Sequence, residues 1–335
     1  MMIRRNEGPR ALIDSFGRAI TYLRVSLTDK CNMKCGYCYA STARDTAITP
    51  ELDNKGLLTP IRAFASLGVN KVRFTGGEPL LRRGIVELVA HTREIAGISI
   101  IGVTTNGLLA ERNLARLIDA GLNRINISLD TLNRHRFKAI TGVDGFDRVG
   151  AGIEAAVSSG AFSQVKVNTV VMRGINDDEL RALAEWAIGR GIDIRFIEFM
   201  PTEKSGWSRE RFVGEVEMRS KIGLELIPVS EEGNSRGPAT TYKYKDLPGR
   251  VSFISAVSCS FCDNCNRLRL TSKGEVIGCL FQEDKMDLGQ MIHKGASIGE
   301  ISQRIVEAVA RPGFRRQPDD VSITSYKPLM KAVGG

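Results

Sequence analysis

The stretch "YLRVSLTDKCNMKCGYC" (residues 22–38) decides the fold. Residues 22–28 alternate between apolar and polar side chains, and Cys31, Cys35 and Cys38 follow directly. Alternation of this kind predicts a β-strand. In folds built from alternating strands and helices, the loops after the carboxyl ends of the strands carry the chemistry. We therefore expect the three thiols in a loop at the mouth of such a domain.

Five further strand candidates follow along the chain, with apolar residues at helical spacing between them: residues 71–75, 99–105, 124–130, 164–171 and 193–199. Regular alternation of strand and helix favours parallel βα units. Six units are too few for the closed eight-stranded form. The sequence thus predicts an α/β fold, an incomplete (β/α)6 barrel of the TIM type.

The composition of the chain and its pattern of strands and helices change after about residue 225. Residues 230–250 are polar and rich in turn formers, and short strand patterns follow near residues 251–255 and 267–271. A chain of 335 residues is long enough for a large domain and a smaller one. We predict a barrel domain over residues 1–225 and a small C-terminal iron–sulfur domain over residues 226–335.

Composition narrows the class of protein. No apolar run approaches about 18 residues, and the N-terminus lacks the apolar centre of a secretory signal, so we expect no membrane span and a cytoplasmic protein. The net charge of +9 is compatible with a solvated basic surface or with an anionic partner. No block of five like charges occurs, which makes nucleic acid the weaker choice.

The seven cysteines fall into two groups, which favours metal binding over a disulfide scaffold. Three thiolates can hold three irons of a 4Fe–4S cluster and leave the fourth iron open for another ligand. Cys31, Cys35 and Cys38 form one such set, and Cys262, Cys265 and Cys279 form the other. The alternatives are zinc sites, completed by a distant histidine in the first group or by Cys259 in the second.

Basic residues recur within the strand candidates. Residues two apart on a strand share a face, and a buried cation without a partner is costly. Any one of these residues could pair with a buried acid, but as a set they favour a polyanion, and arginine suits phosphate. The set comprises Arg24, Arg73, Lys166, Arg195, Arg267 and Arg269.

Several motifs together resemble one family. They are residues 12–38, "RFTGGEPLLRR" (73–83), "SLDTL" (128–132), "GINDDE" (174–179), "IRFIEFMP" (194–201), "SFCDNCNRLRLT" (260–271) and the terminal "GG". The chain resembles the GTP 3′,8-cyclases of the radical S-adenosylmethionine superfamily, which begin molybdenum cofactor biosynthesis. The resemblance implies cleavage of S-adenosylmethionine at the first cluster to a 5′-deoxyadenosyl radical. That radical takes the ribose 3′ hydrogen of GTP, and the carbon radical closes on guanine C8.

The resemblance also implies residue roles. Two 4Fe–4S clusters would use the two cysteine triads, with Cys31, Cys35, Cys38, Arg267 and Arg269 as the catalytic set. S-Adenosylmethionine would contact Tyr37, Gly77, Ser128 and Met200. GTP would contact Arg24, Arg73, Thr104, Lys166, Arg195, Arg267, Leu268 and Arg269.

Partners follow from the same resemblance. We expect an electron donor such as flavodoxin or ferredoxin, and cyclic pyranopterin monophosphate synthase as the next enzyme. We expect no nucleic acid and no membrane, and a homodimer stays open. Two rival functions remain: another two-cluster radical enzyme of a peptide-maturing type, and a zinc-binding nucleic-acid module.

Two further segments bear on the active site: the loop after Cys38 and the end of the sequence. The family commonly continues the first motif as Y-C-M-P, whereas this chain has Tyr39 and Ala40, so the loop over the first cluster is expected to differ in shape. Gly334 and Gly335 are expected to reach into the active site, because glycine permits close backbone approach.

Overall fold

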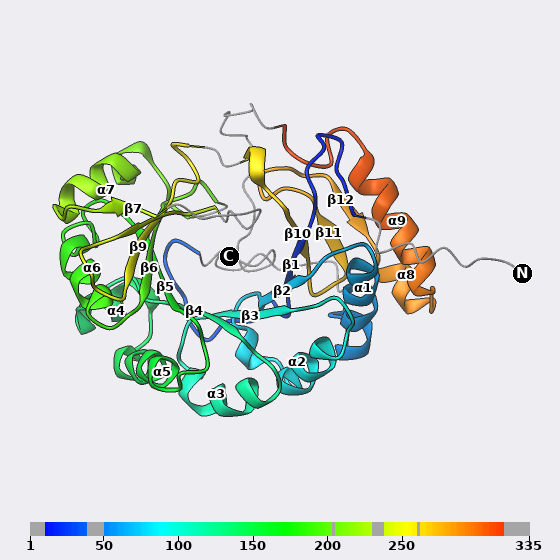
Figure 1. Cartoon of the computed structure of the whole chain (residues 1–335), viewed down its shortest axis with the longest axis horizontal. Helices are drawn as coiled ribbons and strands as arrows, with labels where there is room; N and C mark the ends of the chain where they lie inside the picture. The colour runs from blue at the N-terminus through cyan, green and yellow to red at the C-terminus, as the bar shows by residue number, and fades with distance from the viewer. Residues whose placement is uncertain (1–10, 39–49, 203–204, 230–237, 260–261, 318–335) are drawn as a thin grey trace, which may run out of the picture.

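One curved sheet organises the molecule. The computed structural model describes residues 11–38, 50–202, 205–229, 238–259 and 262–317. In that part of the chain twelve strands form a single sheet in the order β12-β11-β10-β1-β2-β3-β4-β5-β6-β9-β8-β7. Figure 1 shows the sheet bending into an open barrel with helices around its outer side. The expected incomplete α/β barrel is confirmed.

The middle of the sheet is parallel, and it contains all six predicted strands, each beginning within one residue of its expected position. They are β1 (Tyr22–Ser26), β2 (Lys71–Thr75), β3 (Ile100–Thr105), β4 (Arg124–Ser128), β5 (Val165–Val171) and β6 (Asp193–Glu198). Two later strands continue the parallel arrangement at its ends: β10 (Arg267–Leu270) pairs with β1, and β9 (Arg250–Ile254) pairs with β6.

Helices cover the outer side of this sheet (Figure 1). Those between the barrel strands are α1 (Asn54–Ser66), α2 (Ile85–Arg93), α3 (Ala110–Asp119), α4 (Arg134–Thr141), α5 (Phe146–Ser158) and α6 (Leu180–Ile188). After β6 come α7 (Glu215–Ile222), α8 (Gly289–His293) and α9 (Ile298–Ala310), and α9 contacts α1. Short 3-10 turns lie at Pro79–Leu81, Arg209–Arg211 and Cys262–Asn264.

The alternation of side chains along β5 separates a core from a cavity. Val165, Val167 and Val171 are buried in the hydrophobic core, between the sheet and the helices. Lys166 and Asn168 alternate with them and line the cavity on the inner side. A period of two on the other barrel strands sorts their side chains in the same way. The sheet therefore places its polar residues inside the barrel.

The strands after residue 225 extend both ends of this sheet. At one end, β8 (Thr240–Lys243) and β7 (Ile227–Pro228) follow β9, and at the other β11 (Glu275–Ile277) and β12 (Lys285–Asp287) follow β10; all four attach antiparallel. The sheet thus continues past the predicted domain boundary at 225, and the division there stays a prediction. No helix in the described ranges has the length and apolar character required to cross a membrane.

Candidate active site

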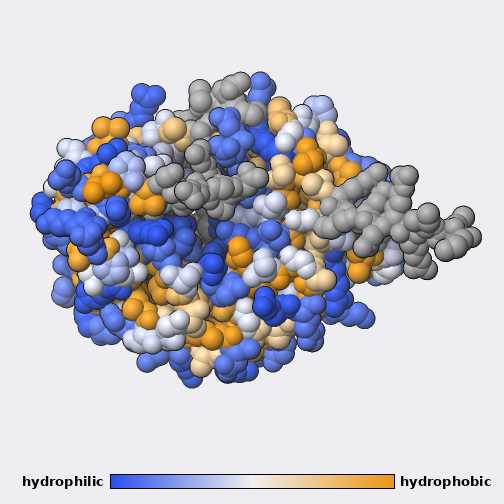
Figure 2. All heavy atoms as spheres, viewed as in Figure 1, coloured by the Kyte–Doolittle hydropathy of each residue, from blue (hydrophilic) through white to orange (hydrophobic). Residues whose placement is uncertain are grey.

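A basic cavity of about 290 Å³ lies on the inner side of the sheet. Nine arginines and two lysines line it, and its described lining contains no aspartate or glutamate. In Figure 2 hydrophilic residues are frequent around the centre of the face shown. A concave site with many cations and no lining acid suits a polyanion.

Most of the residues expected to bind GTP come together here. The lining includes Arg24, Arg73, Thr104, Lys166, Arg195, Arg267 and Arg269. Leu268 is the exception, because its side chain is 1% exposed and packs in the hydrophobic core. The period of two along β10 turns it away from Arg267 and Arg269, so only its backbone is left to contact a ligand in the cavity.

Arg73 is held by a tyrosine hydroxyl, a side-chain amide and a backbone carbonyl. Its Nε donates to the Tyr22 hydroxyl oxygen at 2.9 Å, and its Nη1 donates to Asn126 Oδ1 and to the Val103 carbonyl, each at 2.9 Å. None of these partners is a carboxylate. No carboxylate therefore balances the charge of Arg73 among these contacts.

Asp193 is the buried acid behind two other cations. Its Oδ2 lies 3.5 Å from Lys166 Nζ and 3.2 Å from Arg195 Nη2, and its Oδ1 accepts a 2.7 Å hydrogen bond from Ser252. The pairing of a basic residue with a buried acid is thus realised for Lys166 and Arg195. Because one carboxylate is shared between two cations, the three side chains together keep a net positive charge.

The pKa values in the cavity reflect this crowding. Burial would raise the pKa of Tyr22, but nearby cations, led by Arg73 and Arg24, lower it to about 7. Burial lowers the pKa of Arg24 to about 10. Burial, followed by repulsion from Arg195, lowers the pKa of Lys166 to about 8. An anion in the cavity would relieve this repulsion.

Two oxygen atoms of uncharged side chains that line the cavity are buried without a hydrogen-bond partner in the described part of the chain. They are Thr104 Oγ1 and Asn168 Oδ1. Buried polar atoms nearly always have a partner in native proteins. These two atoms therefore mark positions for a ligand's polar groups.

The first cysteine loop follows β1 and docks on α4. Lys34 N donates to the Thr141 carbonyl at 2.8 Å, and Gly36 N donates to the Ile140 carbonyl at 3.1 Å. The Tyr37 hydroxyl donates to Asp130 at 2.7 Å. These bonds hold the loop at the carboxyl end of the strands.

The three thiols of this loop lie close enough to interact. Burial, followed by the negative charge of Asp130, raises the pKa of Cys35 well above its usual value, and Cys38 and Cys31 add to the effect. Burial also raises the pKa of Cys31, although Met33 N approaches its Sγ at 3.4 Å. Thiolates in such a place are stable when a cationic metal group binds them.

The glycines of residues 75–79 are required by the protein's own packing. A Cβ on Gly77 would lie 2.3 Å from the Lys30 carbonyl oxygen, and one on Gly76 would lie 2.5 Å from that of Thr28. Gly77 N donates to the Thr28 carbonyl at 2.7 Å. Gly77 was expected to contact S-adenosylmethionine; the structure shows both glycines packed closely against residues 28–30, at the start of the cysteine loop.

Glu78 connects this turn to the end of β3. Its carboxylate accepts from Leu80 N at 2.9 Å, from Thr105 Oγ1 at 2.8 Å and from Asn106 N at 2.7 Å. Asn106 Nδ2 in turn lies 3.7 Å from Cys31 Sγ. Burial raises the pKa of Glu78 to about 7. The loop after β3 is thereby tied to the first cysteine.

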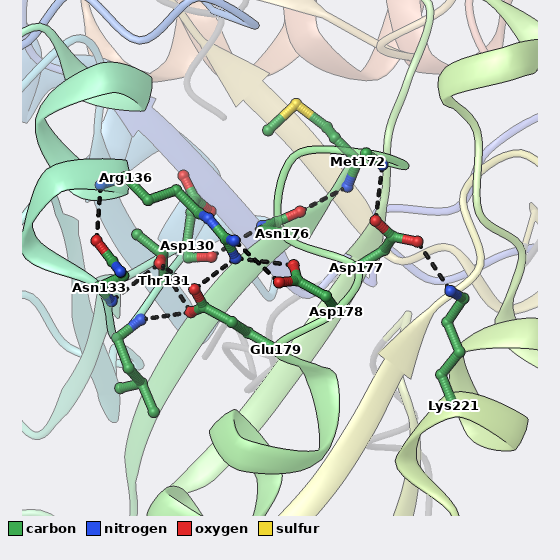
Figure 3. Close-up of polar contacts among 12 residues, drawn as sticks. Asp130, Thr131, Asn133, Arg136, Met172, Asn176, Asp177, Asp178, Glu179 and Lys221 are labelled. Atoms are coloured by element: carbon green, nitrogen blue, oxygen red, sulfur yellow. Dashed lines mark hydrogen bonds and ion pairs between the residues drawn. The ribbon is translucent and has the colours of Figure 1, made fainter.

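A polar network supports Asp130 from behind (Figure 3). Glu179 accepts from Thr131 Oγ1 at 2.7 Å and from Arg136 Nη1 at 2.5 Å. Asn176 Nδ2 donates to the Asp130 carbonyl at 2.8 Å. The motif "GINDDE" therefore positions the partner of Tyr37.

The second cysteine triad lies in the wall of the cavity. Cys262, Cys265 and Cys279 are among its lining residues, and the thiol of Cys279 interacts electrostatically with the other two. Burial would raise the pKa of Cys265, but Arg267 and Arg315 lower it to about 7. Cys259 is exposed and is not among the lining residues.

The donor sets fit clusters better than single ions. All seven cysteines are free thiols. Within the described residues, no three His, Cys, Asp or Glu side chains converge on one metal ion. A cubane cluster places each cysteine on a different iron, so its thiols need not converge on one point.

Comparison with known protein families and sequences identifies relatives of the chain. A profile described as "Radical SAM superfamily" matches residues 25–187, and one described as "Molybdenum Cofactor Synthesis C" matches residues 192–316. A GTP 3′,8-cyclase of Thermodesulfovibrio yellowstonii is 40% identical, over 96% of this chain and 99% of the relative. The chain belongs to the GTP 3′,8-cyclase family.

Further relatives support the assignment, and a solved structure shares the fold. The GTP 3′,8-cyclase of Hydrogenovibrio crunogenus is 39% identical, over 90% of this chain and 92% of its own. Mouse molybdenum cofactor biosynthesis protein 1 is 42% identical, over 90% of this chain and 47% of its own length. Streptococcus suis SuiB bound to S-adenosylmethionine shares the fold, with a TM-score of 0.59 at 16% identity over 91% of this chain and 78% of SuiB.

Some residues of the family site carried a signal that our sequence reasoning did not use. Tyr22, Lys71 and Asn126 line the cavity, and each lies two positions from a residue on the same face of its strand. Arg18 and Arg315 also line it, but they lie outside the strands. No periodic pattern in the sequence points to that second pair.

Of the other predicted residues, one lines the cavity, and the rest lie away from it or outside the described ranges. Met200 lines the cavity, whereas Ser128 ends β4 half-buried and is not among the lining residues, and neither are Tyr37 and Gly77. Tyr39 and Ala40, where the chain departs from the usual family motif, lie outside the described residues. Gly334 and Gly335 do so as well.

Proposed function

We propose that this chain converts GTP to 3′,8-cyclo-7,8-dihydro-GTP, the first step of molybdenum cofactor biosynthesis. The observation that carries the proposal is the cavity with eleven cations, no acid in its described lining and a cysteine triad in its wall. When bound, S-adenosylmethionine and its cluster supply the radical chemistry. The chain binds the substrate, orients it and excludes water.

The cations of the cavity bind the triphosphate. Arginine forks match phosphate oxygens in pairs, which fixes orientation as well as adding affinity. Arg24, Arg267 and Arg269 lie on neighbouring strands, with Arg24 in register with Arg269. In this proposal they hold the phosphates, while Thr104 and Asn168 meet other polar groups of the nucleotide. Arg267 and Arg269 are thereby assigned to the catalytic set.

The second triad would hold a 4Fe–4S cluster that faces the substrate. Three cysteine ligands leave one iron position for the purine ring. Cys262, Cys265 and Cys279 are already in the cavity wall, so a purine held there stays near the phosphate-binding cations. The guanine end would then be fixed independently of the phosphates.

The first triad, Cys31, Cys35 and Cys38, would hold the other 4Fe–4S cluster. Tyr37, Gly77, Ser128 and Met200 would contact S-adenosylmethionine. Met200 supports this arrangement because it follows β6 and lines the same cavity as the GTP residues. One side chain could therefore contact the cofactor on one side and the substrate cavity on the other.

Partners belong to the same proposal. A small electron-transfer protein such as flavodoxin or ferredoxin would reduce the first cluster. Cyclic pyranopterin monophosphate synthase would consume the product. We propose a cytoplasmic enzyme, and a homodimer is compatible with it.

Anaerobic turnover tests the reaction. The purified chain, reconstituted with iron and sulfide, is given GTP, S-adenosylmethionine and dithionite, and 5′-deoxyadenosine and 3′,8-cyclo-GTP are quantified separately. We expect both products, and we expect the cyclised nucleotide to require both GTP and S-adenosylmethionine. Formation of 5′-deoxyadenosine with no cyclised nucleotide would favour the peptide-maturing alternative. Stoichiometric zinc in place of iron would favour the nucleic-acid module.

Arg269→Ala tests the substrate assignment. A charged hydrogen bond contributes roughly 1.5–3 kcal/mol, so GTP affinity should fall about ten- to a hundred-fold. Arg304→Ala is the control, because Arg304 is an exposed residue of α9 that pairs with Glu307 at 3.8 Å. Anaerobic calorimetry measures both variants beside their iron content. Equal affinity in the two variants would remove Arg269 from the GTP site.

A further inference from the structure

A charged side chain is buried beside the second cysteine triad, at Arg315. It is 2% exposed, and the preceding Phe314 is fully buried. A Cβ on Gly278 would lie 2.0 Å from the Phe314 carbonyl oxygen, so this segment passes directly over the residue before Cys279. Burying a cation is costly unless its surroundings compensate for the lost water.

Asp14 supplies part of that compensation. Its Oδ2 lies 2.7 Å from Arg18 Nε and 3.3 Å from Arg315 Nε. The two guanidinium groups then reach the backbone of the cysteine loop: Arg18 Nη1 donates to the Cys262 carbonyl at 2.6 Å, and Arg315 Nη2 donates to that of Cys265. Asp14, Arg18 and Arg315, here called the Asp14 clamp, thereby hold two cysteines of the triad.

One nitrogen of the clamp is left over. Arg315 Nη1 is buried and has no hydrogen-bond partner among the described residues. The same guanidinium is attracted electrostatically to Cys265 and Cys279, and it lines the cavity. Arg315 Nη1 thus carries an N–H donor that has no acceptor among the described protein groups, close enough to Cys265 and Cys279 for their charges to interact, and the sulfur atoms of a cluster are acceptors.

We propose that Arg315 Nη1 donates a hydrogen bond to the sulfur of the second iron–sulfur cluster, and that Asp14 and Arg18 position it. This rests on the proposed second cluster. Hydrogen bonds to the sulfurs and nearby charge set the reduction potential of such clusters. A cationic donor stabilises the more negative, reduced state, so Arg315 raises the potential.

Redox titration of the second cluster alone tests this. The parent protein is the full-length chain with Cys31, Cys35 and Cys38 replaced by serine, reduced stepwise and followed by its electron paramagnetic resonance signal. Arg315→Gln should retain iron and shift the potential to a more negative value. Arg311→Gln is the control, since Arg311 is exposed and pairs with Asp284 at 3.1 Å, and it should leave the potential unchanged.

The outcomes separate tuning from folding. An unchanged potential in Arg315→Gln at full iron content overturns the proposal. If Arg315→Gln loses the cluster, Arg315→Lys decides: a cluster retained by lysine supports a cationic N–H donor, and loss in both variants overturns it. A parent protein that binds no iron would overturn the second cluster itself, and this inference with it. A parent that binds iron and is insensitive to Arg315 would overturn the inference alone.

Asp14→Asn tests the positioning part. Without the carboxylate, the two guanidinium groups lose their shared partner, and we expect iron to leave the second cluster faster on challenge with a chelator than in the Arg311→Gln control. Cleavage of S-adenosylmethionine by the otherwise intact enzyme should persist, because the first cysteine loop is held by α4 and Asp130 instead. Equal rates of iron loss in both variants would contradict a positioning role.

Discussion

At the scale of single residues, burial weakens the positive charge of Lys166 in the cavity. Burial and Arg195 both lower its pKa, to about 8, and Asp193 only partly opposes them. A bound triphosphate would raise that pKa, because an opposite charge favours the protonated form. Binding of GTP is therefore expected to take up a proton as the pH approaches 8.

The pH dependence of GTP affinity follows from this linkage. As pH rises through about 8, the free enzyme loses the Lys166 proton while the complex keeps it, so affinity should fall by up to about tenfold per pH unit. Calorimetry at about pH 7 to 9 measures the slope. Lys166→Arg should reduce the slope, because the guanidinium stays charged and only Tyr22, whose pKa is about 7, still titrates near this range. The same slope in the arginine variant would assign the effect to another group.

Sequence reasoning reached the residues that lie on strands and missed those that do not. Arg24 and Arg269 were predictable because a period of two fixes their face. Arg18 lies in an irregular segment, and apart from the nearby Asp14 its partners are carbonyls distant in sequence. Local pattern carries no information on such contacts, so the Asp14 clamp could not be predicted.

At the scale of elements, the turn after β2 acts as the base of the first cysteine loop. Gly77 contacts the backbone of residues 29–30, and Glu78 ties the turn to Thr105 and Asn106. The loop therefore depends on an element distant from its own cysteines in sequence. Disturbing the turn should release iron without touching a ligand.

Gly77→Ala tests this dependence. The added Cβ would meet the Lys30 carbonyl at 2.3 Å, so the loop must shift, at a cost of roughly 1–3 kcal/mol in folding free energy. We expect a lower Tm and loss of first-cluster iron. Gly150→Ala in α5 is the control, because nothing lies within 4 Å of the position that its new methyl group would take, and alanine favours helix. Normal iron in Gly77→Ala would contradict the proposed dependence.

The strands themselves were predicted better than the order in which they pair. The six barrel strands were found because each has its own alternation, read within a few residues. The pairing of β10 with β1 and of β9 with β6 joins strands that are far apart in the sequence. For this reason a continuous sheet was not expected beyond residue 225.

At the scale of the whole molecule, the two cysteine triads are held by separate structures. The first depends on α4, Asp130 and Glu78, and the second on the Asp14 clamp and the wall of the cavity. The residues that support one triad in these contacts are different from those that support the other. The two proposed clusters should therefore assemble independently.

Cysteine substitutions test that independence. Cys35→Ala should abolish cleavage of S-adenosylmethionine and leave about four of about eight irons. Cys265→Ala should leave a similar number but keep the cleavage while losing the cyclised nucleotide. Cys259→Ala should change neither, since Cys259 is exposed. Iron analysis beside product quantification measures each; loss of both clusters in one single variant would contradict independent assembly.

The clamp also sets an order of events during synthesis. Arg18 meets the backbone of Arg316, 298 positions later in the chain, whereas β1 to β6 pair each with the next. Ordering so long a loop is slow and comes late in folding. The barrel strands can therefore pair on the ribosome while the last arginines are still unmade. The cations of the cavity therefore repel one another fully only after the barrel strands have paired and their hydrophobic core has formed.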